Sequence, residues 1–249
     1  MKVKKGNYMY SLFKKTYKGS KQDFFAKLEE NLNSNKKMFI VTANPETFMN
    51  SKRDISYYNI LKDKITTIVA DGIGIVKASK KFNLKIKERI PGIDIAKELL
   101  ILANKNKKTL YLFGANEEVI LKTKKIICNA YPDINILGYS NGYVDDKDSV
   151  FEEIIKLSPD IILVGLGIPS QEQLIYKHIN KFKKGIFIGV GGTFDVISGC
   201  KKRAPKLFIN LNLEWLYRII TEPKRLKRFF NNNVKFMFYI NHEKRNKET

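Results

Sequence analysis

Hydrophobic and polar positions follow two patterns along most of the chain. Short apolar runs rich in β-branched residues alternate with longer stretches in which apolar residues recur every three or four positions. The short runs predict buried β-strands at Met38–Ala43, Ile65–Ala70, Thr109–Phe113, Ile134–Tyr139, Asp160–Leu166 and Gly185–Val190. The longer stretches predict helices at Ile93–Asn104, Glu117–Ala130, Ser149–Leu157 and Ser170–Phe182.

This alternation predicts a Rossmann-like α/β fold, with a mostly parallel sheet and helices on both of its faces. We expect the α/β domain to cover residues 1–205. Residues 206–249 form a predicted C-terminal appendage, in which Leu207–Ile220 and Leu226–Ile240 read as basic amphipathic helices interrupted near Pro223.

The loops that follow the predicted strands are the expected ligand site, because parallel sheets bind ligands beyond the carboxyl ends of their strands. Four of five such loops contain glycine; the five are Thr42–Glu46, Asp71–Gly74, Phe113–Asn116, Gly165–Glu172 and Gly189–Asp195. Each glycine alone is compatible with a simple tight turn. Several at one sheet edge favour a nucleotide site, since glycine lets backbone N–H groups approach a diphosphate. The chain has no GxxxxGK[ST] phosphate loop.

Composition adds a strong positive charge to this picture. The 249 residues are 43% hydrophobic, enough for one sizeable core, and 46 Lys and Arg against 25 Asp and Glu give a net charge of +21. An acidic partner is therefore expected: phosphate, nucleic acid or anionic lipid. Part of the lysine excess is equally compatible with compositional bias. Residues 201–249 hold 13 Lys and Arg against 4 Asp and Glu, interleaved with aromatic residues, which favours a membrane surface over simple packing on the domain.

Cysteine and histidine are too sparse for several chemistries. Cys128 and Cys200 lie far apart without a CxxC pair, which argues against a disulfide scaffold or a cysteine zinc site. The two histidines, His178 and His242, are expected at the surface and provide little material for a metal site or a catalytic triad. The N-terminal stretch lacks the apolar core of a signal peptide, and no apolar run is long enough to span a bilayer. We therefore expect a cytoplasmic protein with at most peripheral membrane contact.

The strand-end loops and the tail together resemble the motif series of the WecG/TagA/CpsF glycosyltransferases. The resemblance runs in the family's order from about Met38 to Arg228. The motifs that carry it are Thr42-Ala-Asn44, Ala70-Asp71-Gly72-Ile-Gly74, Arg89-Ile-Pro-Gly92-Ile-Asp94, Gly165-Leu-Gly167-Ile-Pro169-Ser-Gln171-Glu172, Gly191-Gly192-Thr-Phe-Asp195, Arg203-Ala204-Pro205, and Glu214-Trp215-Leu-Tyr-Arg218 with Pro223-Lys-Arg225-Leu-Lys-Arg228.

The resemblance implies an inverting enzyme that needs no metal or other cofactor. Such an enzyme takes a sugar from a UDP-sugar donor and attaches it to N-acetylglucosamine on undecaprenyl diphosphate, at the inner face of the cell membrane. The TagA branch implies N-acetylmannosamine, a β-1,4 linkage and wall teichoic acid synthesis. Relatives in the family use the uronic acid form or other sugars for capsule and exopolysaccharide, so the donor sugar stays open. The resemblance also implies that the tail docks on the membrane and completes the active site.

An inverting transfer needs a base for the acceptor hydroxyl and positive groups for the departing diphosphate. Asp71, at the end of an apolar strand, is the predicted base. Arg89 and the tail residues Arg218, Arg225 and Arg228 are the predicted diphosphate ligands, since guanidinium presents paired donors. The three tail arginines share one helical face if the helix continues across Pro223.

Neutral polar residues at the other strand ends suit a sugar or a nucleoside. Thr42 and Asn44 are expected to orient the sugar. Gln171 is predicted to reach a ligand, while Glu172 is expected only to favour the helix dipole. Asp195 is compatible both with uracil or ribose binding and with stabilising its own loop.

Three rival interpretations remain at this stage. Asp146-Lys-Asp148 matches the Asp-x-Asp that holds a divalent metal in many glycosyltransferases, but Asp148 also suits the N-cap of the next helix, and we favour a metal-free site. A nucleic-acid-binding protein would explain the charge but not the loops, so no nucleic-acid partner is expected. An oxidoreductase with a Rossmann site is disfavoured, because the chain has no GxGxxG motif after its first predicted strand.

A homo-oligomer is compatible with the sequence, which does not fix the oligomeric state.

Overall fold

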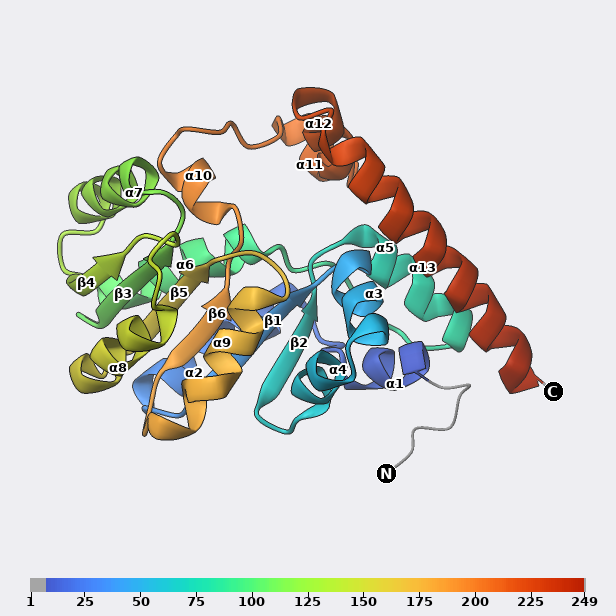
Figure 1. The fold of residues 1–249 in the computed structure, drawn as a ribbon, viewed down its shortest axis with the longest axis horizontal. Coiled ribbons are helices and arrows are strands. Elements are labelled where there is room, and N and C mark those ends of the chain that lie inside the picture. Colours follow the sequence, from blue (N-terminus) through green and yellow to red (C-terminus); the bar gives the residue numbers. More distant parts are fainter. Residues whose placement is uncertain (1–7, 249) are drawn as a thin grey trace.

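A computed structural model of the chain describes residues 8–248, without the side chains of Arg225, Arg228 and residues 246–248 (Figure 1). Within these residues the core is a six-stranded sheet in which every neighbouring pair is parallel, in the order β2-β1-β6-β5-β3-β4. The strands are β1 (Met38–Ala43), β2 (Thr66–Ala70), β3 (Thr109–Gly114), β4 (Asn135–Ser140), β5 (Ile161–Gly165) and β6 (Ile186–Gly189). The prediction of a Rossmann-like fold is confirmed, and each predicted strand agrees to within one residue at either end.

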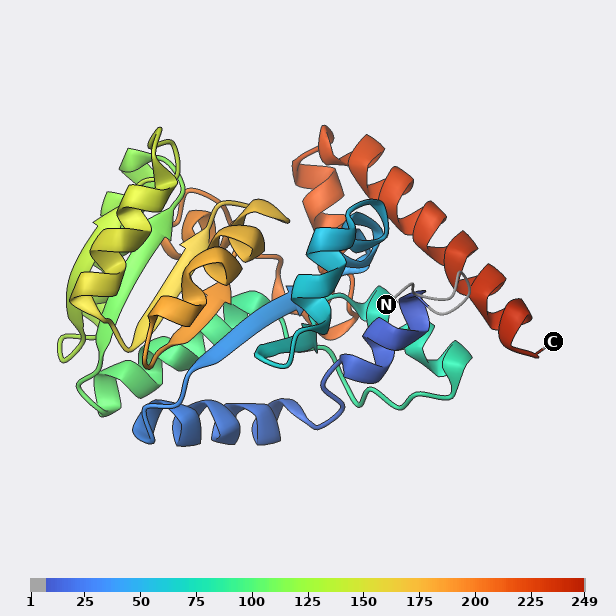
Figure 2. The ribbon, with the colours of Figure 1, turned by 60° about the horizontal axis from the view of Figure 1, so that its bottom comes forward.

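Helices cover both faces of the sheet (Figure 1, Figure 2). Alternate strand residues face opposite layers: Phe39 and Val41 lie in one apolar cluster, Met38 and Ile40 in the other. The first layer contains α1 (Tyr8–Lys15), α3 (Pro45–Arg53), α4 (Ile55–Lys62), α5 (Ile73–Ser79), α8 (Lys147–Leu157) and α9 (Ser170–His178). The second contains α2 (Lys21–Asn33), α6 (Gly92–Lys105), α7 (Glu117–Ala130) and α10 (Thr193–Ile197).

Neighbouring strands β1 and β6 send the chain to opposite faces of the sheet. After β1 the chain enters α3, in the first layer, whereas after β6 it enters α10, in the second. Connections that diverge in this way open a crevice between the strand ends, where ligands of such sheets bind. The fold therefore directs attention to the carboxyl ends of β1, β6 and the neighbouring β2.

The tail differs from its prediction at two points. The expected helix over Leu207–Ile220 is wrong: α11 (Lys206–Asn210) and α12 (Glu214–Thr221) are separate, because Asn212 adopts a left-handed conformation with φ of 60° that ends a helix. After Pro223 a longer helix, α13 (Arg225–Glu248), begins. The helix does not continue across Pro223, so Arg218 and the arginines at 225 and 228 do not share one helical face.

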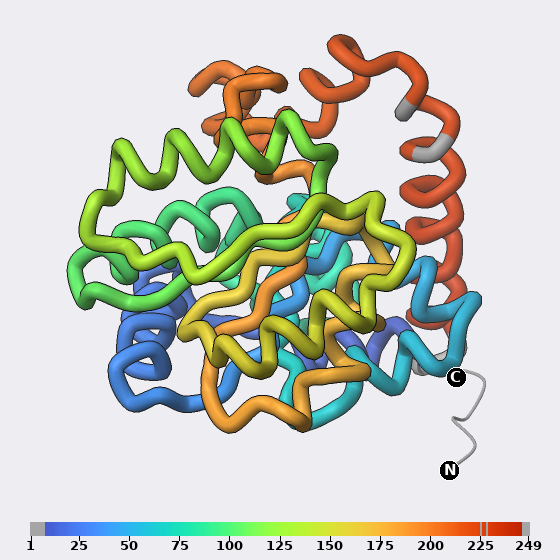
Figure 3. Tube along the Cα trace, turned by 60° about the vertical axis from the view of Figure 1, so that its left-hand side comes forward, coloured from blue at the N-terminus to red at the C-terminus, as the bar shows by residue number. Residues whose placement is uncertain are grey.

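The last helix, α13, packs against the α/β domain. It lies alongside α3, as Figure 3 shows from a second direction, and its Phe236 and Ile240 are buried in the first-layer core. The ring of Phe236 lies 6.0 Å from that of Phe48 and 6.3 Å from that of Phe13. In this structure the tail is therefore part of the folded body.

A buried carboxylate fastens the far end of α13. Glu243 accepts hydrogen bonds from the backbone N–H groups of Met9, at 2.9 and 3.0 Å, and Tyr10, at 3.1 Å. These donors belong to the first turn of α1, where backbone N–H groups have no partner within the helix. Burial raises the pKa of the Glu243 carboxyl, and the backbone donors act in the opposite direction.

Two further observations concern membrane spans and thiols. Among the described residues, none of the helices combines the length and the apolar character that crossing a bilayer requires. Cys128 and Cys200 are exposed free thiols.

Candidate active site

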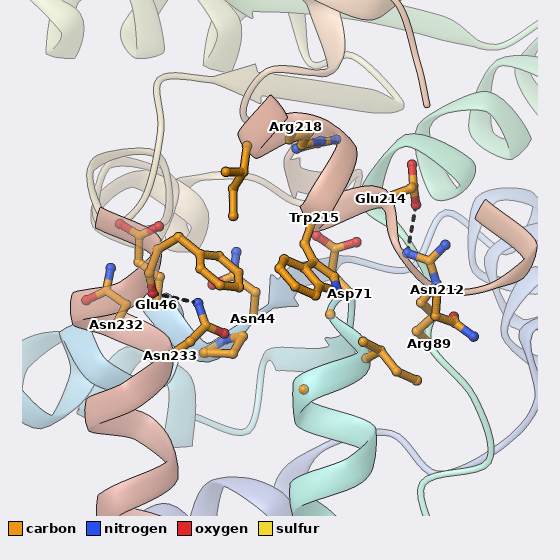
Figure 4. A pocket seen from close by; sticks show the side chains of 16 residues that line it. Asn44, Glu46, Asp71, Arg89, Asn212, Glu214, Trp215, Arg218, Asn232 and Asn233 are labelled. Carbon is orange, nitrogen blue, oxygen red and sulfur yellow. Dashed lines mark hydrogen bonds and ion pairs between the residues drawn. The ribbon is translucent and has the colours of Figure 1, made fainter. Parts of the chain in front are cut away.

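A pocket of about 400 Å³ lies between the carboxyl ends of β1 and β2 and the tail (Figure 4). The α/β domain contributes one side of it, including Asn44, Glu46, Asp71 and Arg89. The tail contributes the other, with polar and aromatic residues of α12 and α13 and the loop before them: Asn212, Glu214, Trp215, Arg218, Phe229, Asn232 and Asn233. The pocket therefore requires the tail in its docked position.

The register of β1 and β2 sets Asn44 and Asp71 side by side. Ala43 pairs with Ala70, so the residues that follow each strand meet at the sheet edge, and the Asp71 N–H donates to the Ala43 carbonyl at 2.9 Å. Asn44 is also the N-cap of α3, since its Oδ1 accepts from the Thr47 N–H at 3.1 Å. The cap fixes the Asn44 side chain at the pocket wall.

Asp71 has the environment of a carboxylate suited to accept a proton. Withdrawal from water is the largest effect and raises the pKa of Asp71 above the usual range. The charge of Arg218 lowers this pKa and that of Glu214 raises it. Arg89 and the hydrogen bond from the Gly92 N–H make smaller contributions that lower it. That N–H donates to the Asp71 Oδ1 at 3.3 Å. Burial dominates, so the carboxylate is more basic than a free aspartate, which favours general-base chemistry near neutral pH.

Arg89 meets the tail through a buried ion pair. Its guanidinium Nη1 lies 2.7 Å from the Glu214 Oε2, with side chains only 14% and 10% exposed. Glu214 also faces Arg203, whose Nε is 3.6 Å from the Glu214 Oε1 and whose Nη2 is 2.6 Å from the Asp94 Oδ1. These ion pairs fasten the start of α12 to the domain. Glu214 had no predicted role, although the residue begins one of the motifs that carry the family resemblance.

Two stacked aromatic rings, from the helices before and after Pro223, form part of the pocket wall. Trp215 of α12 and Phe229 of α13 stack with ring centroids 4.8 Å apart and planes 6° apart. Figure 4 shows the Trp215 indole beside Asp71, with Arg218 farther along α12 on the same side of the pocket. Sequence reasoning missed this pair because the two residues lie on different helices.

Of the predicted site residues, Asn44, Asp71, Arg89 and Arg218 meet in this pocket. Arg225 and Arg228 lie on the first turn of α13, and their side chains lie outside the described residues. Their contacts with a diphosphate stay predictions.

Thr42, Gln171 and Asp195 gather beside the pocket, around the loop that follows β6. Thr42 is buried and its hydroxyl donates to the Gly189 carbonyl at 3.4 Å. Asp195 lies 3.4 Å from the Lys201 ammonium. Gln171 is buried and uses its amide within the protein. Their ligand contacts also stay predictions.

The Asp-x-Asp carboxylates face structural partners outside the pocket. Asp146, and not Asp148 as expected, is the N-cap of α8, accepting from the N–H groups of Asp148 and Ser149 at 3.0 Å. Asp148 pairs with Lys177 and with His178, each at 2.6 Å. The expectation of a surface His178 is wrong, because its ring is buried and stacks on Phe151. Among the described side chains, His, Cys, Asp and Glu form no cluster of three suited to a metal ion.

The pocket combines the strand ends of a Rossmann-like domain with Asp71, whose pKa is raised, and with the nearby arginines Arg89 and Arg218. These are features of an enzyme that transfers a group from a phosphorylated donor. Comparison with known proteins specifies the class. The pattern of the glycosyl transferase WecG/TagA/CpsF family matches residues 11–249, and the chain belongs to this family of glycosyltransferases.

Similar proteins include two named N-acetylglucosaminyldiphosphoundecaprenol N-acetyl-beta-D-mannosaminyltransferase. The one from Bacillus subtilis (strain 168) is 43% identical over 210 residues, which are 84% of this chain and 81% of the relative. The one from Staphylococcus aureus (strain NCTC 8325 / PS 47) is 39% identical over 213 residues, 85% of this chain and 83% of the relative. The family match also includes the tail, which supplies half of the pocket.

Proposed function

We propose that the protein transfers N-acetyl-β-D-mannosamine from UDP-N-acetylmannosamine to N-acetylglucosaminyl diphosphoundecaprenol. The names of its relatives give this sugar and this acceptor. The observation that carries the proposal is the meeting of Asp71, Arg89 and Arg218 in one pocket between domain and tail. The product would be an intermediate in the synthesis of wall teichoic acid or a related cell-surface polysaccharide.

The chemistry is a single displacement with inversion. The acceptor hydroxyl oxygen attacks the anomeric carbon as the bond from that carbon to the UDP oxygen breaks. The hydroxyl proton passes to the Asp71 carboxylate, whose raised pKa makes it a better base. Arg218, and Arg89 once it engages the diphosphate, stabilise the charge that develops on UDP.

The proposed reaction proceeds without a metal ion, with these arginines in the role that a divalent cation plays elsewhere. The Asp-x-Asp carboxylates already cap α8 and pair with Lys177 and His178. We expect excess EDTA to leave the initial rate unchanged, measured as UDP release. A rate that collapses with EDTA and returns with Mg²⁺ or Mn²⁺ contradicts this mechanism.

We further propose that the tail rests on the anionic inner surface of the cell membrane, where the acceptor lipid lies. Five exposed apolar residues recur at helical spacing on α13, and three more lie along α11, α12 and the loop between them. The exposed apolar residues are Leu207, Leu211, Ile220, Leu226, Phe230, Val234, Met237 and Phe238. Exposed Lys224, Lys227 and Lys235 supply positive charge for anionic lipid.

A donor panel tests the function directly. Purified protein is incubated with a short-chain lipid-diphosphate-GlcNAc and, in turn, UDP-linked N-acetylmannosamine, N-acetylmannosaminuronic acid, glucose and galactose, and the products are weighed by mass spectrometry. We expect one N-acetylhexosamine to be added from UDP-N-acetylmannosamine. Transfer only from another donor would assign the same site a different sugar, and no transfer from any donor would refute the proposal.

A further inference from the structure

Glu214, the first residue of α12, is a buried carboxylate between two arginines. Its side chain is 10% exposed, and the Arg89 Nη1 lies 2.7 Å from its Oε2, the ion pair drawn in Figure 4. On the other side, the Arg203 Nε lies 3.6 Å from the Glu214 Oε1. The two contacts are unequal, because the first is a close ion pair and the second is longer than a hydrogen bond.

Arg203 has an unused donor near Glu214. Its Nη2 donates to the Asp94 Oδ1 at 2.6 Å, which binds one end of the guanidinium. Its Nε is buried and has no hydrogen-bond partner among the described residues. A buried N–H without an acceptor destabilises the protein, and the Glu214 carboxylate lies just beyond hydrogen-bond distance. The Arg203 Nε therefore offers the Glu214 carboxylate a second partner.

The α/β domain holds Arg203 in place. The Asp94 carboxylate that binds it also pairs with the Lys21 ammonium, at 2.7 Å. Asp94 lies in the first turn of α6 and Lys21 begins α2, so both partners belong to the second helical layer of the domain. If Glu214 pairs with Arg203 in place of Arg89, the start of α12 remains fastened to the domain.

Arg89 has a competing task once the donor is bound. Its guanidinium lines the pocket, where the proposed reaction requires it to bind the donor diphosphate. A diphosphate there competes with Glu214 for the same N–H groups. Without another partner, Glu214 would become an unpaired charge among buried residues, which would oppose binding of the diphosphate. A hydrogen bond to the Arg203 Nε removes this opposition.

We propose that Glu214 is a positioning residue that moves from Arg89 to the Nε of Arg203 when the donor diphosphate binds. Without a donor, Glu214 neutralises Arg89 at the pocket wall. With the diphosphate bound, Arg89 is released to the ligand, and Glu214 keeps α12 on the domain through Arg203. This inference rests on the proposed function for the identity of the ligand.

A double-mutant cycle of E214Q and R203K tests the movement, with UDP affinity measured by calorimetry at constant pH and salt. Lysine keeps the positive charge for Asp94 but has no second nitrogen for Glu214. We expect R203K to weaken UDP binding about tenfold, the effect of one charge-assisted hydrogen bond, because Glu214 then stays on Arg89. In the E214Q background the same change should have almost no effect.

The single variant E214Q should bind UDP at least as tightly as the wild type, because a neutral amide competes less for Arg89. A structural role that merely fastens the tail makes the opposite prediction, since E214Q would then loosen α12 and weaken binding. Weaker UDP binding by E214Q, or an equal loss from R203K in both backgrounds, overturns the proposal.

K21M is the matched control, because Lys21 is the other partner of Asp94 and its ammonium binds no oxygen of Glu214. Its UDP affinity should equal that of the wild type. Equal losses in K21M and R203K would mean that these ion pairs act only by stabilising the domain and tail, which would also overturn the proposal.

A second measurement observes Arg203 directly. The Nε–H signal of Arg203 in a ¹⁵N NMR spectrum, assigned by its absence in R203K, shows whether this group donates a hydrogen bond. We expect UDP to slow its exchange with solvent in the wild type and to leave it unchanged in E214Q. A wild-type signal that does not respond to UDP overturns the proposal. If the signal responds but no sugar is transferred from any donor, the proposed function fails while the movement of Glu214 stands.

Discussion

Asp71 lies among three charged side chains that act on it in opposite directions. Arg218 and Arg89 lower its pKa, Glu214 raises it, and burial outweighs them all. The position of the residue at the end of β2 depends on its pairing with β1 and not on its own conformational preference. Its proposed function as base therefore depends on surroundings that come from four separate parts of the chain.

Replacing Asp71 by Asn tests that function. The amide keeps the size of the side chain and the acceptor for the Gly92 N–H but cannot accept the proton, so we expect kcat to fall about 10²- to 10⁴-fold. UDP affinity, measured by calorimetry, should change little because the arginines remain. Unchanged turnover would exclude Asp71 as the base.

Glu214 provides the matching pH prediction. A general base works only when ionised, so kcat/KM falls as the pH drops through the pKa of Asp71, which burial holds above the usual aspartate range. In E214Q the charge that raises this pKa is gone, and Arg89 is released from its ion pair. We expect the acidic limb of the kcat/KM profile to move to lower pH than in the wild type. A limb that stays in place would mean that another group controls it.

At the scale of elements, the six strands and helices α6 to α9 were predicted from the sequence, whereas α1 to α5 were not. The apolar runs specified all six strands, because a strand buried on both faces needs continuous apolar residues. Among α1 to α5, caps fix several of the helix starts, such as the Ser20 capping box of α2 and the Asn44 capping box of α3. The division of α11 from α12 depends on one asparagine in a left-handed conformation.

The contact between α13 and α1 predicts a specific weakness in the tail. Replacing Glu243 by Ala leaves the Met9 and Tyr10 N–H groups without their acceptor, at a cost of about 1–3 kcal/mol. We expect faster hydrogen exchange around Phe236–Glu243 and a lower Tm. K235A is the matched control, since Lys235 is exposed on the same helix. If both variants exchange alike, Glu243 does not fasten α13.

For the whole molecule, the tail and the domain together line the candidate active site. Trp215 and Arg218 enter the pocket from the tail, and Phe236 and Ile240 extend the core. The division of the chain at residues 205 and 206 stays a prediction, but the pocket walls cross that boundary. The pocket thus has walls from both sides of that boundary.

Removal of the tail should therefore abolish transfer and not merely membrane binding. We expect a chain ending at Pro205 to lose activity even on a water-soluble acceptor analogue, because Arg218 and the Trp215 wall are gone. Since α13 covers Phe48 and Phe13, circular dichroism must establish that the shortened protein is folded.

A charge-reversed full-length protein, K224E/K227E, separates the two roles of the tail. These lysines are exposed and line no part of the pocket, so activity on the soluble acceptor should persist while binding to anionic vesicles falls. Full activity of the shortened chain would refute the shared site. Unchanged vesicle binding of K224E/K227E would refute the electrostatic contact.

Local sequence patterns were enough to predict the parallel sheet and the sheet edge at which we expect ligands, because strand patterns and strand-end motifs are local in the chain. The family motifs singled out Asn44, Asp71, Arg89 and Arg218 as candidate site residues. Which of these residues meet depends on how the chain folds in three dimensions. Thr42, Gln171 and Asp195 lie around the β6 loop, while Glu214, Trp215 and Phe229 enter the pocket from the tail. Contacts between distant segments depend on strand order and helix packing, which local patterns do not contain.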